Sequence, residues 1–159
     1  MGYNYRSIAV YFDSTNKLIG FPNGVFEKWN AMMQLDCYRI LTEAYLDDQL
    51  EAFLMELFSL CYSEEPNENS SPLQTLTKTK SYKSSVKNLG LVSSHWVENE
   101  GYTITPTWQS AKDRNSFLHI EDKAIKLPED YKPGELAVVF RKAMEMSPIG
   151  PQMSAPVLD

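Results

Sequence analysis

The chain has 159 residues, 43% of them hydrophobic, and a formal net charge of −6. This length and composition fit one domain with its own hydrophobic core, and no apolar run reaches the roughly 18 to 20 residues of a membrane-spanning helix. The first residues carry neither the basic nor the apolar segment of a secretory signal, so we expect a cytoplasmic protein that contacts no membrane.

The chain opens with a predicted β-hairpin. Residues 3–12 alternate in side-chain character, residues 13–16 are typical of a turn, and residues 17–21 form the second strand. The Pro-Asn-Gly sequence at 22–24 predicts the end of that strand.

Residues 25–35 are ambiguous. Their large apolar side chains are Phe26, Trp29, Met32 and Met33. The spacing fits a short helix, yet Trp29 and the methionine pair could equally form an exposed contact patch. We favour a helix that faces the core, because a domain of this size needs its aromatic side chains inside. Residues 37–44 are expected to be a strand or an extended link.

A helix is predicted over residues 48–62. Asp48 fits the N-cap position, and Glu51 follows three residues later as in a capping box. Apolar residues surround nearly the whole helix, which predicts the central helix of the domain. The polar residues 63–72 that follow are expected to form a mobile loop.

The second half of the chain is predicted to be mainly strands, with a hairpin turn at 99–101. The expected strands are residues 75–87, 89–97, 102–108, 117–120 and 124–127. Together with the first hairpin they predict an α+β fold, in which helices pack on one mainly antiparallel sheet. We expect residues 1–147 to form this single domain.

The last predicted element is a helix over residues 133–146. Pro133 suits the first helical position, and Ser147 followed by Pro148 ends the helix. Four residues with helical spacing form its buried stripe: Leu136, Val139, Phe140 and Ala143. Residues 148–159 contain three prolines and are predicted to be a tail that is flexible or that packs only against a partner.

The strand at 101–108 and the helix from Glu135 to Ser147 resemble the C-terminal part of the immunity proteins of bacterial contact-dependent growth inhibition, the CdiI family. Members of that family end in a strand, an acidic or proline-containing turn, and a helix of the form Glu-Leu/Ile-Gly-x-Ala-hydrophobic-x-x-Ala-Leu-x-x-Ser. This chain departs from that form at Ala137, where glycine is expected, and at Met144, where leucine is usual. The resemblance covers residues 78–147.

The resemblance implies a bacterial antitoxin without catalytic activity or cofactor. Its partner would be the C-terminal domain of a cognate toxin, which it binds and neutralises through surface complementarity. Such toxins are often nucleases, whose basic surfaces hold phosphates.

Acidic residues are concentrated in one part of the sequence. Between Arg39 and Lys78 there are eight Asp or Glu residues and no Lys or Arg, so this segment carries −8 and the rest of the chain +2. One interpretation is a solvated face that keeps the domain soluble. The resemblance favours the other interpretation, a negative surface that attracts a basic toxin. The candidate partner-binding residues are Asp47, Asp48, Glu51, Glu64, Glu65 and Glu68, with Tyr45 and Tyr62 as exposed aromatic residues near them.

No catalytic or metal-binding motif is present in the sequence. His95, His119, Cys37 and Cys61 do not have the spacing of metal ligands, so we expect no metal and no catalytic residue, but two reduced, buried thiols and two ordinary histidines. Two alternatives stay open. A regulatory or scaffold module would bind through Trp29 and the methionine pair, and a small enzyme would need His95, His119 or a carboxylate pair in a cleft.

A lysine cluster follows the acidic segment at positions 78, 80, 83 and 87. Basic residues interleaved with an aromatic residue are typical of nucleic-acid binders. In an acidic domain we interpret the cluster as an edge strand protected by lysines, and we expect no direct binding of nucleic acid.

Overall fold

The computed structural model describes residues 3–69 and 71–158, so Ser70 of the predicted loop and Asp159 of the predicted tail lie outside it. The strands of the described residues are β1 (Tyr5–Phe12), β2 (Leu18–Phe26), β3 (Ala31–Gln34), β4 (Arg39–Leu41), β5 (Gly90–Val97), β6 (Gly101–Ser110), β7 (Ser116–His119), β8 (Ile125–Leu127) and β9 (Pro151–Gln152). Their helices are α1 (Asp47–Leu60), α2 (Pro72–Thr77), α3 (Tyr82–Val86) and α4 (Glu135–Met146), with short 3-10 turns η1 (Glu27–Trp29), η2 (Ala111–Asp113) and η3 (Glu121–Lys123).

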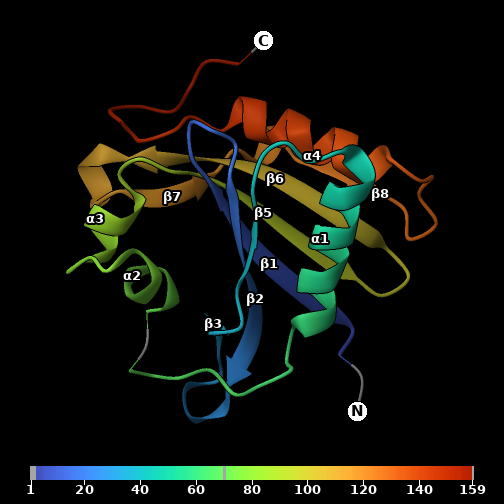
Figure 1. The fold of residues 1–159 in the computed structure, drawn as a ribbon, viewed down its shortest axis with the longest axis horizontal. Coiled ribbons are helices and arrows are strands. Elements are labelled where there is room, and N and C mark those ends of the chain that lie inside the picture. Colours follow the sequence, from blue (N-terminus) through green and yellow to red (C-terminus); the bar gives the residue numbers. More distant parts are fainter. Residues whose placement is uncertain (1–2, 70, 159) are drawn as a thin grey trace.

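The central strands form a sheet in the order β3-β2-β1-β5-β6-β7 (Figure 1). Strand β4 pairs at the side of β2, and β8 and β9 pair at the side of β6. All described pairings are antiparallel except that of β9, which runs parallel to β6 at Gln109 and Ser110. The prediction of an α+β fold with helices packed on a mainly antiparallel sheet is therefore confirmed.

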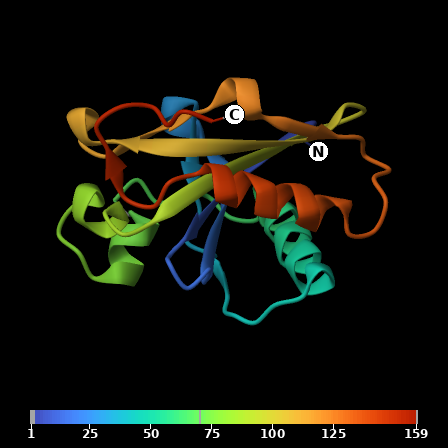
Figure 2. The ribbon, with the colours of Figure 1, turned by 90° about the horizontal axis from the view of Figure 1, so that it is seen from above.

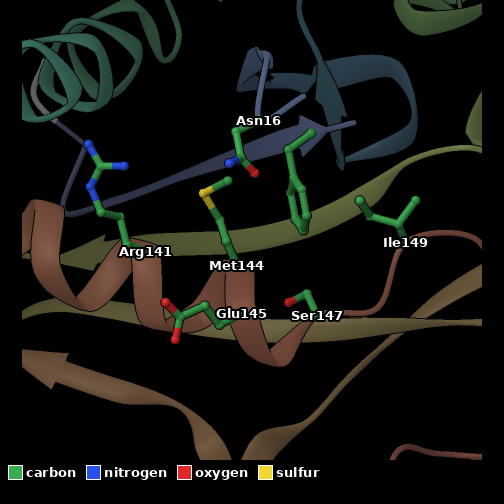
Figure 3. A pocket seen from close by; sticks show the side chains of 7 residues that line it. Asn16, Arg141, Met144, Glu145, Ser147 and Ile149 are labelled. Carbon is green, nitrogen blue, oxygen red and sulfur yellow. The ribbon is translucent and has the colours of Figure 1, made fainter. Parts of the chain in front are cut away.

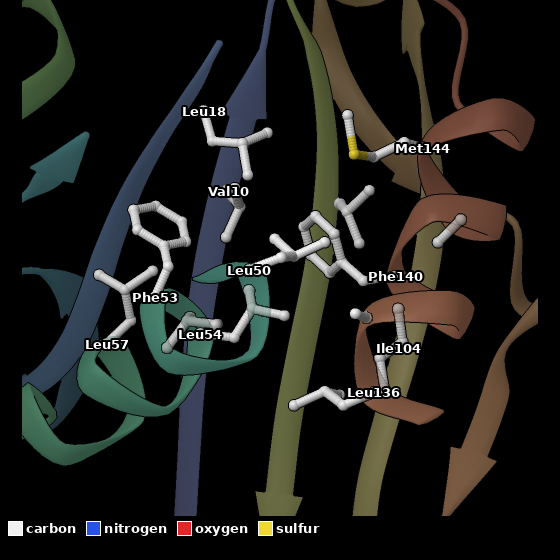
Figure 4. Close-up of a cluster of buried hydrophobic side chains, with 14 of the residues drawn as sticks. Val10, Leu18, Leu50, Phe53, Leu54, Leu57, Ile104, Leu136, Phe140 and Met144 are labelled. Carbon is white, nitrogen blue, oxygen red and sulfur yellow. The ribbon is translucent and has the colours of Figure 1, made fainter. Parts of the chain in front are cut away.

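Successive residues of β1 point to opposite faces of the sheet and enter two different cores. Ile8, Val10 and Phe12 face α1 and α4 in the larger core, where side chains from both helices meet those of the strands (Figure 4). Tyr11 faces the other way, into a smaller core with Leu73 of α2 and its neighbours from α3. In Figure 2 the β1–β2 hairpin lies between these two groups of helices.

The predicted helix at 48–62 is confirmed as α1, but its start differs. Leu46 flanks the first turn, and its backbone N–H donates to the side-chain oxygen of Gln49 over 2.7 Å. Asp48 lies inside the helix, so its assignment as the N-cap is wrong. The helix buries one face only, since Met55 on the opposite side is exposed.

The predicted helix at 25–35 is wrong, and so is the predicted strand end at 22–24. Pro22 and Gly24 are part of β2, which continues to Phe26. Pro22 pairs with Ile8 of β1, and Gly24 pairs with Met33 of β3. The turn η1 and the left-handed backbone of Asn30, at φ 46°, then reverse the chain into β3. Trp29 is 56% exposed and Met32 is 41% exposed, so these two side chains do not belong to the core.

The predicted strand at 75–87 is also wrong, because these residues form α2 and α3. Lys78 has a left-handed backbone that ends α2, and the side chain of Ser81 accepts a hydrogen bond from the N–H of Ser84 at the start of α3. Tyr82 and Val86 are four residues apart, and this spacing fits both a helix and the alternating pattern of a strand. The lysine-protected edge strand therefore does not exist.

The C-terminal helix is confirmed as α4, which begins at Glu135 after a left-handed Gly134 at φ 93°. Pro133 precedes the helix and does not open it. Leu136, Phe140 and Ala143 are buried as predicted, whereas Val139 is half-buried. The flexibility of residues 148–159 stays a prediction. Within the described part of the chain, none of the helices is both long and apolar enough to cross a membrane.

Candidate partner-binding surface

The structure separates the eight predicted partner-binding residues into two groups at opposite ends of α1. One group precedes or opens the helix: Tyr45, Asp47, Asp48 and Glu51. The other group follows its last turn: Tyr62, Glu64, Glu65 and Glu68. A helix of 14 residues is about 21 Å long. The acidic segment is therefore continuous in sequence but divided between two places on the molecule.

Most of the first group is engaged within the protein. Asp47 accepts a hydrogen bond of 2.9 Å from Nε of Arg141, and Glu51 accepts one of 3.2 Å from the backbone N–H of Ala137. Tyr45 is 5% exposed, so its expected exposure is wrong. Its hydroxyl donates to a backbone carbonyl in the β1–β2 turn, and the Arg141 guanidinium lies 5.0 Å from the centre of its ring.

Three residues of the second group, Tyr62, Glu64 and Glu65, line a groove of about 330 Å³, which we call the acidic groove. It is lined by Tyr3, Val25, Glu27, Tyr62, Glu64 and Glu65. The rings of Tyr3 and Tyr62 stack with their centres 3.6 Å apart and their planes inclined by 14°. The N–H of Tyr62 donates to the carbonyl of Asn23, and its hydroxyl donates to the carbonyl of Tyr5. The tyrosine stack therefore links the end of α1 to the first two strands.

The acidic groove carries three carboxylates, and no basic residue lines it among residues 3–69 and 71–158. Glu64 accepts a hydrogen bond of 3.1 Å from the backbone N–H of Asp36. The carboxylates of Glu27 and Glu65 have no hydrogen-bond or ion-pair partner in those two ranges. The last turn of α1 has no basic side chain, and the partial negative charge of a helix C-terminus adds to the field of the carboxylates.

Glu68 does not line the acidic groove but forms an ion pair with Lys28 of η1, with 3.6 Å between the charged atoms. Lys28 is flanked by Glu27, which lines the groove, and by the exposed Trp29. This contact connects the residues after α1 to the β2–β3 ribbon. Sequence reasoning did not identify Tyr3, Val25 or Glu27, because they lie far from the acidic segment along the chain.

Two other pockets have mixed character. The first, of about 380 Å³, lies between the β1–β2 turn and α4, where Asn16 faces Arg141, Met144 and Glu145 (Figure 3). The second, of about 310 Å³, contains the Arg6 guanidinium, which lies 5.7 Å from the centre of the Trp96 ring.

In the second pocket Arg6 donates to the last turn of α1, and the Trp96 indole N–H donates to Glu129. The polar groups of this pocket are thus largely used in holding neighbouring elements together.

The two histidines lie on neighbouring parts of the sheet. His95 is half-buried on β5, and its ring stacks on that of Tyr5 at 5.6 Å. Burial is the main cause that lowers the pKa of His95, and the charges of His119 and Lys126 lower it further. His119 is exposed on β7. Among the described residues, no three His, Cys, Asp or Glu side chains are grouped so that they could hold a metal ion.

The two cysteines differ in environment. Cys61 is buried, and burial raises the pKa of its thiol, which donates to the carbonyl of Ser7. Cys37 is only half-buried, so the prediction of two buried thiols is correct for Cys61 alone.

The sequence matches no protein-family model and no curated protein. Its fold, however, is similar to solved structures over nearly the whole chain. A chain of the CdiA-CT/CdiI toxin and immunity complex from Yersinia pseudotuberculosis superposes with a TM-score of 0.64 at 11% identity, covering 90% of this chain and 97% of that one. A protein of unknown function from Neisseria meningitidis gives 0.65 at 14% identity, covering 91% of this chain and 98% of that one. The chain thus has a CdiI-like fold, as the resemblance of its C-terminal residues predicts.

Proposed function

We propose that this chain is an immunity protein that binds the C-terminal toxin domain of a contact-dependent growth inhibition system and neutralises it. The observation that carries this proposal is the similarity of the whole fold to a chain of a CdiA-CT/CdiI toxin and immunity complex. The strand and helix pattern at the C-terminus of the sequence supports it separately. The site of action would be the cytoplasm of a bacterium, and inhibition would need no catalysis by this chain.

The charge of the molecule supports a basic nuclease as the toxin. Seven of the eight acidic residues between Arg39 and Lys78 are exposed, and only Glu51 is half-buried. A surface with this charge would speed association with a protein that carries a positive surface for phosphates. Of the eight residues predicted from the sequence, the four that follow α1 remain the proposed contacts with the toxin: Tyr62, Glu64, Glu65 and Glu68. Tyr45, Asp47 and Glu51 at the start of the helix are engaged within the fold.

A second candidate function is a regulatory or scaffold module that binds through the β2–β3 ribbon. It is favoured by the exposure of Trp29 and Met32, since large exposed apolar side chains can mark interaction surfaces. The two candidates differ in the partner, because only an immunity protein protects cells against one toxin domain.

The test is co-expression of this chain with the toxin domain encoded beside its gene. We expect restored growth and a complex of fixed stoichiometry in size-exclusion chromatography, and no protection against a toxin domain from another system. His95→Ala and His119→Ala should protect as well as the wild type, because neither side chain acts chemically. A folded wild-type protein that neither protects nor forms a complex would refute the proposal. Loss of protection in a folded histidine variant would favour an enzyme.

A further inference from the structure

The structure joins two surfaces that the sequence left as alternatives, the acidic residues after α1 and the exposed residues of the β2–β3 ribbon. Glu27 of the ribbon lines the acidic groove together with Glu64 and Glu65. Val25, another lining residue, lies opposite Met32 in the pairing of β2 with β3. These side chains therefore belong to one continuous surface at this end of the molecule.

This surface exposes large apolar side chains as well as carboxylates. Tyr3 is 48% exposed beside the groove, and Trp29 is exposed on the ribbon, where its ring meets Phe26 edge-on at 4.9 Å. Tyr and Trp are the residue types that most often contribute strongly to protein–protein binding. Tyr3 packs on Tyr62 and Trp29 packs on Phe26, so both rings lose little conformational freedom when a partner binds.

The charges of the groove define the chemistry of that partner. Two of its three carboxylates have no hydrogen-bond or ion-pair partner within residues 3–69 and 71–158, and no lining residue is basic. A guanidinium group offers five N–H donors in one plane, pairs with carboxylates in two parallel hydrogen bonds, and stacks on aromatic rings. The carboxylates of Glu64 and Glu65 beside the ring of Tyr62 provide both kinds of contact.

The other end of α1 is less suited to this role. Asp47 is paired with Arg141, and Glu51 bonds to the start of α4, so a partner that used these acids would have to compete with contacts inside the fold. The acidic groove requires no such exchange at Glu27 or Glu65.

We infer that the acidic groove binds a basic segment of the toxin, with an arginine side chain placed between the Tyr3–Tyr62 stack and the carboxylates of Glu64 and Glu65. Trp29 and Met32 contact the apolar part of the same segment. This inference rests on the proposed function, because it takes the toxin domain as the partner. It goes further by naming the surface and the chemical group that the surface recognises.

The test uses the isosteric variant Glu27→Gln/Glu64→Gln/Glu65→Gln, which removes three charges and keeps the side-chain oxygen that accepts from Asp36. Its binding to the toxin domain encoded beside the gene is measured by surface plasmon resonance at several salt concentrations. We expect the affinity at low salt to fall by about tenfold or more, mainly through slower association, and its salt dependence to flatten. Trp29→Ala should act differently, by speeding dissociation. The matched control, Asp47→Asn/Asp48→Asn, should bind as the wild type does.

The outcomes separate the two proposals. If the wild type binds the toxin domain, and the groove variant keeps both its affinity and its salt dependence, the groove is not the contact and the inference is wrong, while the proposed function stands. Loss of affinity in the control variant alone would place the contact at the start of α1. If the wild type forms no complex, both proposals fail.

A second copy of this chain is the other occupant to test. A concentration-dependent dimer that Trp29→Ala abolishes, and that excludes the toxin domain from the surface, would identify a second copy as the occupant and would also overturn the inference.

Discussion

Glu51 of α1 accepts a hydrogen bond of 3.2 Å from the backbone N–H of Ala137, the third residue of α4. The first N–H groups of a helix have no acceptor within it, and a carboxylate at this position also interacts favourably with the helix dipole. Nearby, Arg141 of α4 donates to Asp47 of α1. Acidic residues that the sequence offers as partner contacts therefore connect two helices of the fold.

Replacing Glu51 with Ala should lower the free energy of unfolding by about 1 kcal/mol, the usual cost of losing a helix cap. Glu51→Gln should cost less, because an amide oxygen still accepts the hydrogen bond. Urea denaturation measures both changes. Glu145→Ala serves as control, since Glu145 is exposed in the last turn of α4, where a negative charge is slightly unfavourable. Unchanged stability of Glu51→Ala together with weaker toxin binding would make Glu51 a contact residue and not a cap.

The larger core should depend strongly on Phe140, which is fully buried between α4, α1 and the sheet (Figure 4). Phe140→Ala removes a large side chain from a packed environment and should cost about 3 to 5 kcal/mol. Val138 is two residues away on the exposed side of the same helix, and Val138→Ala should change stability by less than about 0.5 kcal/mol. Similar denaturation midpoints for the two variants would show that the buried face of α4 is misassigned.

Gly101 and Gly134 both have positive φ, but only Gly101 is crowded. A Cβ on Gly101, at φ 101°, would collide with the carbonyl of Leu127 and lie 2.9 Å from the backbone of Pro128. A Cβ on Gly134, at φ 93°, would meet no described atom within 4 Å beyond its neighbours along the chain. Gly134→Ala should therefore cost only about 1 to 2 kcal/mol of backbone strain. Gly101→Ala should cost about 3 kcal/mol or more, because a steric clash adds to the strain. Equal losses in urea denaturation would mean that the chain at β8 can move away from β6.

Periodicity was a good guide where one element buries one continuous face. The buried positions of α4 recur at helical spacing, and the strands β5 and β6 carry enough apolar and β-branched residues to be recognised. The same reasoning failed at residues 25–35, where Phe26, Trp29 and Met32 have helical spacing although the chain turns at Asn30. A left-handed residue in a short reversal leaves no periodic pattern to read.

The candidate surface could be predicted only in part. The excess of acidic residues identified Glu64 and Glu65, but it could not separate them from Asp47 and Glu51, because the sequence does not show that a whole helix lies between the two groups. Tyr3 approaches Tyr62 only through the tertiary fold, as β1 runs beside the end of α1. Long-range contacts of this kind decide which charges remain available to a partner.

His95 should make the stability of the protein depend on pH. Its pKa is lowered from 6.5, first by burial and then by the charges of His119 and Lys126, with Glu100 acting weakly in the opposite direction. As the pH falls below about 6.5, the unfolded chain binds a proton at this residue before the folded chain does, so the free energy of unfolding decreases until the lower pKa is reached. The stability associated with a neutral His95 is therefore fully present above about pH 6.5 and is lost on acidification.

In urea denaturation between about pH 7.5 and pH 5, His95→Gln should therefore lose less stability than the wild type. His119→Gln removes one of the charges that lower the pKa of His95. The stability that this variant loses on acidification should therefore lie between the losses of the wild type and of His95→Gln. If the wild type and His95→Gln show the same pH profile, the proton affinity of His95 is unchanged by folding, and its packing against Tyr5 imposes no cost on the charged ring.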